Sequence, residues 1–375
     1  MDRRQFLLSS VGALVSAVTA KTGLDWRGKR LSAQETRIEE MVRGPSITLR
    51  SLADKVGIDI GAGGINTVPF YKDPDYKKII AREFTSLTPG NAMKFGVIHP
   101  RNNYGDERDY NFEHADAMLE FAEASKMKVR GHTLVWHMQN PRWLDQGNFD
   151  RRELIQVMED HIRTIVSRYK DRVFAWDVVN EPLTINHESI PIFQGIGPEY
   201  IPLAFRFAHE ADPSALLFYN ETQAHNLDEK SNMVYEQVCN LLDEGVTIHG
   251  VGMQMHVSLR YPPNLVQVAK NMRRLGNLGL KVHVTEMDVK TETIDSSTED
   301  KLEKQAKIYG DITKVCLDEE VCTSIATWGV TDRYSWLKEF TKNPEEKPLL
   351  FDADYRAKPS YYAVKRKIAE RVVKI

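Results

Sequence analysis

Two short β-branched stretches, each closed by a glutamate, constrain this chain most strongly. The first, residues 173–179, leads into Asn180, Glu181 and Pro182. So short an apolar run is typical of a strand buried on both faces. Pro182 ends it, because proline restricts the residue before it and has no N–H for a sheet ladder. A lone glutamate at such a place is often only a solvated loop carboxylate, so Glu181 gains weight only from a second stretch of the same design.

That second stretch, residues 281–289, also runs through β-branched residues and carries Glu286. At about 35 residues per strand-and-helix unit, the two glutamates are three units apart, on opposite sides of a small barrel. Two carboxylates that face each other across a cleft are what glycoside hydrolysis requires. The pair therefore predicts a catalytic site of this kind.

Strands and helices are expected to alternate along the whole chain. Amphipathic spacing predicts helices that include residues 115–127, 154–169 and 233–244. Expected strands cover residues 56–61, 84–93, 128–136, 173–179, 216–221, 250–256, 281–289 and 324–330, with a glycine-rich turn at 61–64. This alternation predicts the α/β class and a (β/α)8 TIM barrel. A doubly wound open sheet is the alternative, but it does not explain polar residues at nearly every strand end.

Those strand ends carry side chains suited to sugars, since amides and imidazoles hydrogen-bond hydroxyl groups and indoles stack on sugar rings. Each one alone would more often be a core residue, and their convergence at one end of a barrel is what indicates a site. The residues are His132, Trp136, His137, Asn180, Glu181, Asn220, Gln254, His256, Glu286, Asp288 and Trp328.

Neighbouring polar residues are expected to support Glu286. Asp288 is two positions on, so both carboxylates share one face of the strand. His256, on the preceding strand, is placed to bridge them and to keep Glu286 ionised. Asp177 shares a face with Glu181 but lies four residues deeper, which indicates a buried, hydrogen-bonded structural group.

Composition and the N-terminus indicate an exported globular enzyme. The formal net charge of -3 gives no reason to expect nucleic acid or a membrane surface as partner, and a neutral polysaccharide fits better. Arg3 and Arg4 precede a short apolar region, so residues 1–25 resemble a twin-arginine signal peptide, with an uncleaved anchor as the alternative. We expect residues 26–375 to form one barrel domain, monomeric, periplasmic or secreted, and without stable membrane association once the signal is removed.

Three cysteines bear on the compartment. Cys316 and Cys322 are close enough in sequence to close a small loop before a strand, and an exported protein can keep such a bond. Cys239 stands in an apolar stretch, which indicates a buried free thiol.

The motifs together resemble glycoside hydrolase family 10, the β-1,4-xylanases, from about residue 52 to 364. The resemblance rests on Gly-His-Thr-Leu-Val-Trp-His at 131–137, Asn-Glu-Pro at 180–182 and Gly-Met-Gln-Met-His at 252–256. Thr-Glu-Met-Asp-Val at 285–289 and Trp-Gly-Val-Thr-Asp at 328–332 complete it. Each segment is modestly specific, and their occurrence in this order is highly specific.

The resemblance implies a cofactor-free, metal-free endo-1,4-β-xylanase acting on xylan with retention. Glu181 would be the acid/base and Glu286 the nucleophile. Residues that would hold the sugar, tune the carboxylates or wall the cleft are Asn180, Gln254, His132, His256, Asp288, Trp136, Trp328 and Trp336. Cys316 and Cys322 resemble a family disulfide.

One position departs from the family pattern. The family usually has Thr-Pro-Glu-Asn-x-Met-Lys-Trp on the second strand, where Glu, Asn and Lys bind sugars on the non-reducing side. This chain keeps Asn91 and Lys94 but has Gly90 in place of the glutamate. The resemblance therefore implies an intact mechanism with altered substrate affinity or specificity.

Three alternatives to a xylanase remain open at this point. A carbohydrate-binding protein without useful turnover is suggested by Gly90, and a xylan turnover assay separates it. A metal-dependent hydrolase on His132, His137, His256 and Asp288 lacks any His-x-His or His-Glu-x-x-His spacing. Within the leading class, cellulose or a mixed glucan is the alternative substrate, which product analysis would separate.

Overall fold

Eight parallel strands close into a barrel in the computed structural model, which describes residues 32–102, 109–183 and 195–375. The expected signal peptide lies outside the described residues. The neighbours around the barrel run β1, β2, β3, β4, β5, β6, β8, β9 and back to β1. The strands are β1 (Asp59–Ile65), β2 (Ser86–Pro89), β3 (Lys128–Trp136), β4 (Ala175–Asn180), β5 (Leu216–Glu221), β6 (Gly250–Met253), β8 (Lys281–Lys290) and β9 (Cys322–Trp328). The predicted TIM barrel is confirmed.

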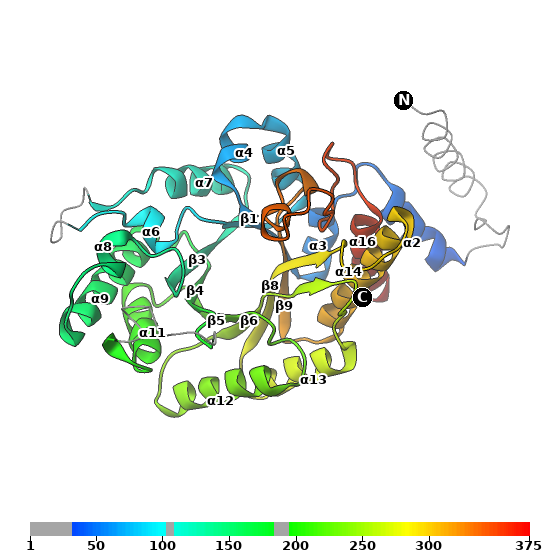
Figure 1. Cartoon of the computed structure of the whole chain (residues 1–375). Coiled ribbons are helices and arrows are strands. Elements are labelled where there is room, and N and C mark those ends of the chain that lie inside the picture. Colours follow the sequence, from blue (N-terminus) through cyan, green and yellow to red (C-terminus); the bar gives the residue numbers. More distant parts are fainter. Residues whose placement is uncertain (1–31, 103–108, 184–194) are drawn as a thin grey trace.

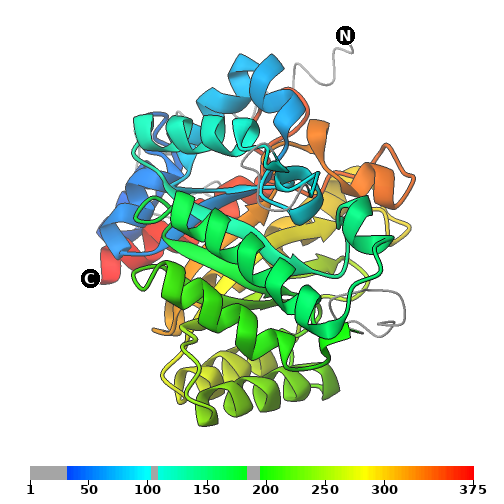
Figure 2. The same ribbon diagram turned by 90° about the vertical axis from the view of Figure 1, so that its left-hand side faces the viewer.

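Helices surround this barrel and cover its outer face (Figure 1). Figure 2 shows α9 and α11, in green, side by side over the strands. The longer helices are α2 (Ala33–Arg43), α3 (Leu49–Val56), α5 (Pro74–Glu83), α7 (Glu113–Ala124), α9 (Arg151–Arg168), α11 (Tyr200–Ala211), α12 (Glu229–Asp243), α13 (Leu265–Gly276), α14 (Thr298–Asp318) and α16 (Pro359–Lys374). Shorter ones are α4 (Thr67–Lys72), α6 (Phe95–Ile98), α8 (Arg142–Asp145), α15 (Leu337–Phe340) and a 3-10 turn at Asp332–Tyr334.

Local chemistry explains why a helix such as α9 begins and packs where it does. Asp150 caps its N-terminus by accepting a hydrogen bond from the Glu153 N–H, and the Glu153 carboxylate in turn accepts one from the Asp150 N–H. Leu154, Met158 and Ile162 then follow at helical spacing and are buried. The helix therefore presents one apolar stripe to the barrel.

The first strand differs from its expected position. The strand was expected to begin at Val56, but Val56 is the last residue of α3 and the strand β1 begins at Asp59. The glycine-rich stretch at 61–64, expected as a turn, lies within β1. A Cβ on Gly61 would come within 2.7 Å of the Ala326 Cβ on β9. The glycines there allow β1 and β9 to approach closely, as glycine within a strand often does.

Two further strands end earlier than expected. The second strand stops at Pro89 instead of Met93. The sixth is interrupted, because Met255 takes a positive φ of 63° and the chain resumes as the short strand β7 (His256–Ser258), which pairs with the extended end of β8. This break matters for the site, since it brings His256 beside Asp288.

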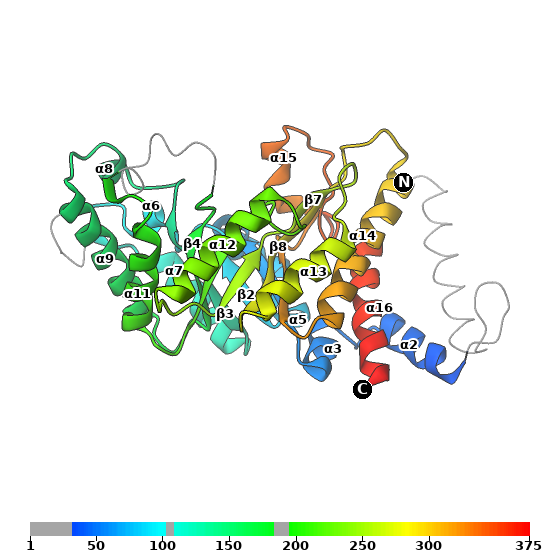
Figure 3. The ribbon, with the colours of Figure 1, turned by 90° about the horizontal axis from the view of Figure 1, so that it is seen from below.

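The barrel has two distinct ends. Figure 3 shows α8 and α15, which follow β3 and β9, on one side of the molecule, and α3, which precedes β1, on the opposite side. The carboxyl ends of the strands therefore share the rim that carries α8 and α15. Among the described residues, none of the helices is both long and apolar enough to cross a membrane.

Cys316, in α14, and Cys322, at the start of β9, are joined by a disulfide, with Cα atoms 5.1 Å apart. Cys239 is free, and it is half-buried instead of buried. The bond closes a loop with a sequence separation of six, so its entropic stabilisation should be about 2 kcal/mol.

The cysteine arrangement makes a direct prediction. Unfolded, non-reduced protein should bind one thiol label, and Cys239→Ser should bind none, because Cys316 and Cys322 stay bonded. Replacing both Cys316 and Cys322 by serine should lower the free energy of unfolding by about 2 kcal/mol, measured by chemical denaturation. Two or three reactive thiols in exported protein would contradict the pairing.

Candidate functional site

The site forms at the carboxyl ends of the barrel strands, where the predicted residues are brought together. Glu181 directly follows β4, and Glu286 lies within β8. Their side chains differ in exposure, at 17% for Glu181 and 5% for Glu286. Glu181 is therefore partly exposed to solvent at the barrel mouth, while Glu286 is buried there.

Glu181 is fixed by its backbone and by two side-chain donors. Its N–H donates to the Asn220 carbonyl at 2.9 Å, and its φ of 53° turns the chain sharply as the strand ends. Trp136 Nε1 donates to Oε2 at 3.2 Å, and Gln254 Nε2 donates to Oε1 at 2.8 Å. Neutral donors thus orient this carboxylate, and His137 Nε2 stands 3.9 Å from it.

Glu286 has a more strongly charged environment. Asn220 Nδ2 donates to Oε1 at 2.7 Å, and His256 Nε2 is 3.3 Å from Oε2. Burial raises the pKa of Glu286, but the hydrogen bond from His256 and the charges of His132 and His256 outweigh burial and lower it below the usual value. The buried carboxylate is therefore held ionised.

A chain of amides connects the two glutamates. Asn180 Oδ1 accepts from Gln254 Nε2 at 3.3 Å and from Asn220 Nδ2 at 2.7 Å. Gln254 and Asn220 also hold Glu181 and Glu286, respectively. These shared donors fix both carboxylates relative to each other across the barrel mouth.

His256 lies between two carboxylates. Its Nδ1 is 3.0 Å from Asp288 Oδ1, while its Nε2 faces Glu286. Burial opposes the charged imidazole, but the carboxylates of Asp288 and Glu286 outweigh burial and raise the pKa of His256 to about 10. Asp288 also accepts a hydrogen bond from Trp336 Nε1 at 2.8 Å. The Trp336 wall and the charged imidazole are therefore anchored to the same carboxylate.

Lys94 and Asn91 form a second polar group beside the cleft. Lys94 Nζ donates to Asn91 Oδ1 at 3.0 Å and lies 4.5 Å from the centre of the Trp136 ring. Burial lowers the pKa of Lys94 to about 8, although the charges of Glu286 and Glu181 oppose this shift. Asn91 and Lys94, the residues of the family motif that this chain keeps, thus lie together, and Lys94 is close enough to both glutamates to feel their charge.

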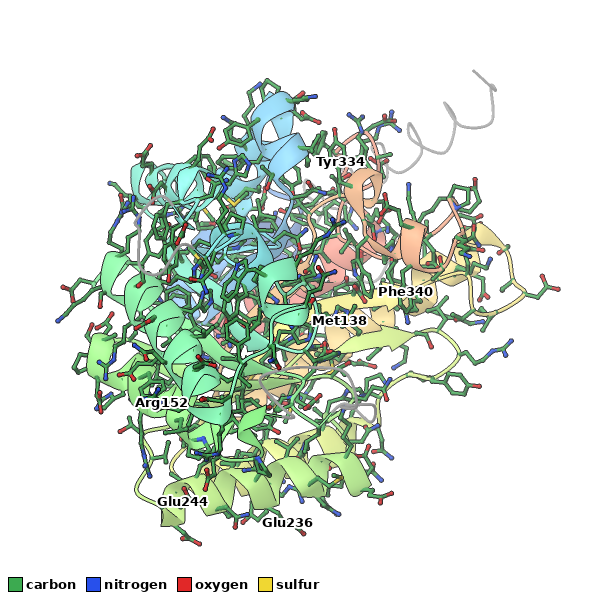
Figure 4. All side chains as sticks on the ribbon, turned by 60° about the vertical axis from the view of Figure 1, so that its left-hand side comes forward. Met138, Arg152, Glu236, Glu244, Tyr334 and Phe340 are labelled. Carbon is green, nitrogen blue, oxygen red and sulfur yellow. A yellow bond between two sulfur atoms is a disulfide. The ribbon has the colours of Figure 1, made fainter. Side chains whose placement is uncertain are left out.

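Aromatic side chains border the site on two sides. The rings of Trp328 and His132 are 5.0 Å apart, and those of Trp336 and His256 are 5.3 Å apart. The ring centre of Phe340 is 4.9 Å from that of Trp336. Phe340 is 63% exposed, and Met138, which follows β3, is 52% exposed. Figure 4 labels Met138 and Phe340, which stand on the segments of this rim.

The main chain of Gly64 occupies the direction in which a side chain at position 90 would point. A Cβ built on Gly90 would stand 3.0 Å from the Gly64 carbonyl carbon and 3.2 Å from its Cα. Gly63 and Gly64 in turn pack beneath the Trp328 indole. Any side chain at position 90 must therefore displace this support by a few tenths of an ångström.

Sequence reasoning missed Arg130 and His283 beneath the site. Arg130 is buried inside the barrel and pairs with Asp177, and its Nη1 is 2.9 Å from His283 Nδ1. Asp177 is buried and hydrogen-bonded, in keeping with a structural group. The signal was available, because an arginine inside an otherwise buried strand needs an anionic partner.

The proposed metal ligands of the alternative hypothesis do not gather into such a site. Across residues 32–102, 109–183 and 195–375, no three His, Cys, Asp or Glu side chains are grouped so as to hold a metal ion. His132 and His256 instead pair with Asp177 and with the Glu286–Asp288 carboxylates.

The charged His256 generates a prediction about stability. Its pKa in the folded protein, about 10, exceeds the ordinary value of about 6.5, so the stabilisation is complete below pH 6.5 and is lost as the pH rises toward 10. The slope is at most about 1.4 kcal/mol per pH unit for one group. The free energy of unfolding of wild type, measured by thermal or chemical denaturation, should therefore fall between pH 7 and 10 more steeply than that of His256→Gln. Equal slopes would contradict a buried charged imidazole.

Comparisons with known proteins agree with this geometry. The model of glycosyl hydrolase family 10 matches residues 48–367. The chain is 42% identical to endo-1,4-beta-xylanase B of Thermotoga neapolitana, over 87% of this chain and 93% of that protein.

Solved structures give the same result. Native xylanase 10B from Thermotoga maritima is 41% identical with a TM-score of 0.83, and the match covers 88% of this chain and all of that one. Xylanase 10B from Thermotoga petrophila, solved with xylobiose, is 41% identical with a TM-score of 0.82, covering 87% and 98%. The chain belongs to glycosyl hydrolase family 10 and is a glycoside hydrolase.

Proposed function

We propose that this glycoside hydrolase is an endo-1,4-β-xylanase that cleaves internal bonds of xylan with retention of configuration. The observation that carries the proposal is the difference in burial and in hydrogen-bond donors between the two linked carboxylates. Glu286 is buried and kept anionic beside His256, whereas Glu181 is partly exposed and is held by neutral donors from Trp136 and Gln254. A retaining enzyme needs this division between nucleophile and acid/base.

In the first step, Glu286 attacks the anomeric carbon while Glu181 donates its proton to the departing glycosidic oxygen. The C–O bond breaks, the leaving chain departs as an alcohol, and the sugar stays bonded to Glu286 as an ester. In the second step, Glu181, now anionic, takes a proton from water, which attacks the same carbon and releases Glu286. Two inversions give net retention.

Xylan as the substrate is supported by the names of the relatives and by the chain's small net charge of -3. Walls of Trp136, Trp328 and Trp336 suit stacking on sugar rings, and the Asn91–Lys94 pair offers polar contacts beside them. Product analysis on xylan, cellulose and aryl glycosides tests this assignment. Preferential release of cello-oligosaccharides would favour the glucanase alternative.

We also propose that the enzyme is exported. The paired arginines and short apolar region near the N-terminus support this, as does the Cys316–Cys322 bond, since disulfides persist in oxidising compartments. An intact N-terminus on protein retained in the cytoplasm would overturn it.

The two glutamates should fail differently when they are replaced. Glu286→Gln cannot form the glycosyl-enzyme and should lose activity on every substrate. Glu181→Ala should keep the glycosylation step of an activated aryl glycoside, because that leaving group hardly needs a proton. Added azide should then speed turnover of this variant by attacking the intermediate. The measurement is burst and steady-state kinetics on aryl xylosides and xylan. Equal loss of glycosylation on both substrates, without an azide effect, would contradict the roles.

The Gly90 position should be tested against a control that carries the same crowding. Both Gly90→Ala and Gly90→Glu place a Cβ against Gly64, but only the second adds an acceptor for sugar hydroxyls. A hydrogen bond to a charged group contributes about 1.5–3 kcal/mol, so the Glu variant should exceed the Ala variant by roughly 10- to 150-fold in kcat/KM on short xylo-oligosaccharides.

The advantage should be smaller on polymeric xylan, where other subsites compensate. A Glu variant that is no better than the Ala variant on short linear substrates would show that the absence of a carboxylate at position 90 does not limit sugar binding.

A further inference from the structure

We propose that Arg130 is a positioning residue that acts on Glu286 through Asp177 and His132, from inside the barrel. The inference rests on the proposed role of Glu286 as nucleophile. Asp177 holds the His132 ring against the site, and Arg130 cancels the charge that Asp177 would otherwise impose on Glu286. The barrel interior beneath the cleft thereby helps to set the charge of the nucleophile.

The ion pair is fully inside the protein. Arg130 Nε lies 3.1 and 3.2 Å from the two Asp177 oxygens, and Nη2 makes a further hydrogen bond to Oδ1. The side chains are 4% and 1% exposed. Such bidentate geometry is what allows a buried pair to offset its desolvation.

Asp177 also contacts His132 and so fixes the position of its ring. Its Oδ2 is 2.9 Å from His132 Nδ1, and the same nitrogen is 4.0 Å from Glu286 Oε1. Burial raises the pKa of Asp177, but the charges of Arg130 and His132 outweigh burial and lower it. An ionised carboxylate only accepts, so His132 Nδ1 carries the hydrogen, and the orientation of the ring is fixed.

The other side of Arg130 is held by a neutral group. Arg130 Nη1 can only donate to His283 Nδ1, at 2.9 Å, so the imidazole hydrogen is on Nε2, which is 3.0 Å from Thr323 Oγ1. Burial and the charge of Arg130 keep the pKa of His283 well below its usual value. The Phe218 ring lies 4.5 Å from the guanidinium. His283 and Phe218 thus hold Arg130 in place and leave Asp177 as the anion that balances it.

Charged groups face Glu286 from several strands. His256 is in contact from β7 and His132 stands near from β3. Asp177 on β4 and Lys94 after β2 act at longer range. Against this fixed background, changing the charge of the Arg130–Asp177 pair should change the titration of Glu286 in a direction set by the sign of the change.

The experiment is a charge cycle on the full chain. Asp177→Asn leaves Arg130 unbalanced, so the acid limb of kcat/KM on an aryl xyloside should move down by about one pH unit, the size of effect a neighbouring charge produces. Adding Arg130→Gln restores neutrality, and the acid limb should return to within a few tenths of a unit of wild type. Carboxyl-13C NMR of Glu286, assigned with Glu286→Gln, reads the same titration without turnover. It therefore separates failure of this inference from failure of the xylanase assignment.

Two further variants complete the design. Thr323→Val removes the hydrogen-bond acceptor of His283 without changing charge, so it should lower the melting temperature but leave the acid limb in place. If Asp177→Asn does not fold, Arg130→Gln alone should raise the pKa of Glu286, because it leaves Asp177 as an unbalanced negative charge beneath the site.

Several outcomes would overturn the proposal. An unmoved Glu286 titration in Asp177→Asn, a double variant that stays shifted, or a shift in Thr323→Val as large as in Asp177→Asn would each show that the pair is only structural. In Arg130→Gln alone, a pKa of Glu286 equal to that of wild type would do the same.

Discussion

The hydrogen-bonded link between Glu181 and Glu286 is the constraint on which the rest of the site depends. Asn180 ends β4, Asn220 lies in β5 and Gln254 follows β6, yet their amides form one chain between the two carboxylates. The closed barrel makes this chain feasible, because it brings the carboxyl ends of those strands to one mouth. The amides can fix the positions of the two carboxylates, but the surrounding charges must make them chemically different.

That difference comes from burial and from unequal partners. Glu286 lies deeper and faces the imidazolium of His256, which is itself held between Glu286 and Asp288. Glu181 is more exposed, with an indole and an amide as donors. Two carboxylates in one network thereby receive different environments, as the proposed division between nucleophile and acid/base requires.

Much of this arrangement could be predicted from the sequence, because the informative residues are periodic. Short apolar runs that end in polar residues locate strands and their catalytic ends, so the barrel and the meeting of Glu181 with Glu286 followed from spacing. The position of β1 did not follow, because its glycines resemble a turn locally and are explained only by the close approach of Ala326 on β9. The break at Met255 was hidden for the same reason, since it depends on how β7 extends the sheet beside β8.

The interior of the barrel was the least predictable part. Arg130 is in a stretch that reads as an apolar strand, and its partner Asp177 is 47 positions away. Such pairing depends on which strands are neighbours, which the local pattern does not contain. The crowding between Gly90 and Gly64 is likewise a tertiary contact, and it changes how the departure from the family pattern at Gly90 has to be tested.

In the proposed mechanism Glu286, and not Glu181, forms the covalent bond to the sugar. The most direct measurement is to trap the intermediate with a slow fluorinated xyloside carrying an activated leaving group, digest the protein, and locate the added mass. One sugar per chain is expected on the peptide that contains Glu286, with no label in Glu286→Gln. A label on Glu181, or a stable intact enzyme that hydrolyses xylan without ever being labelled, would contradict it.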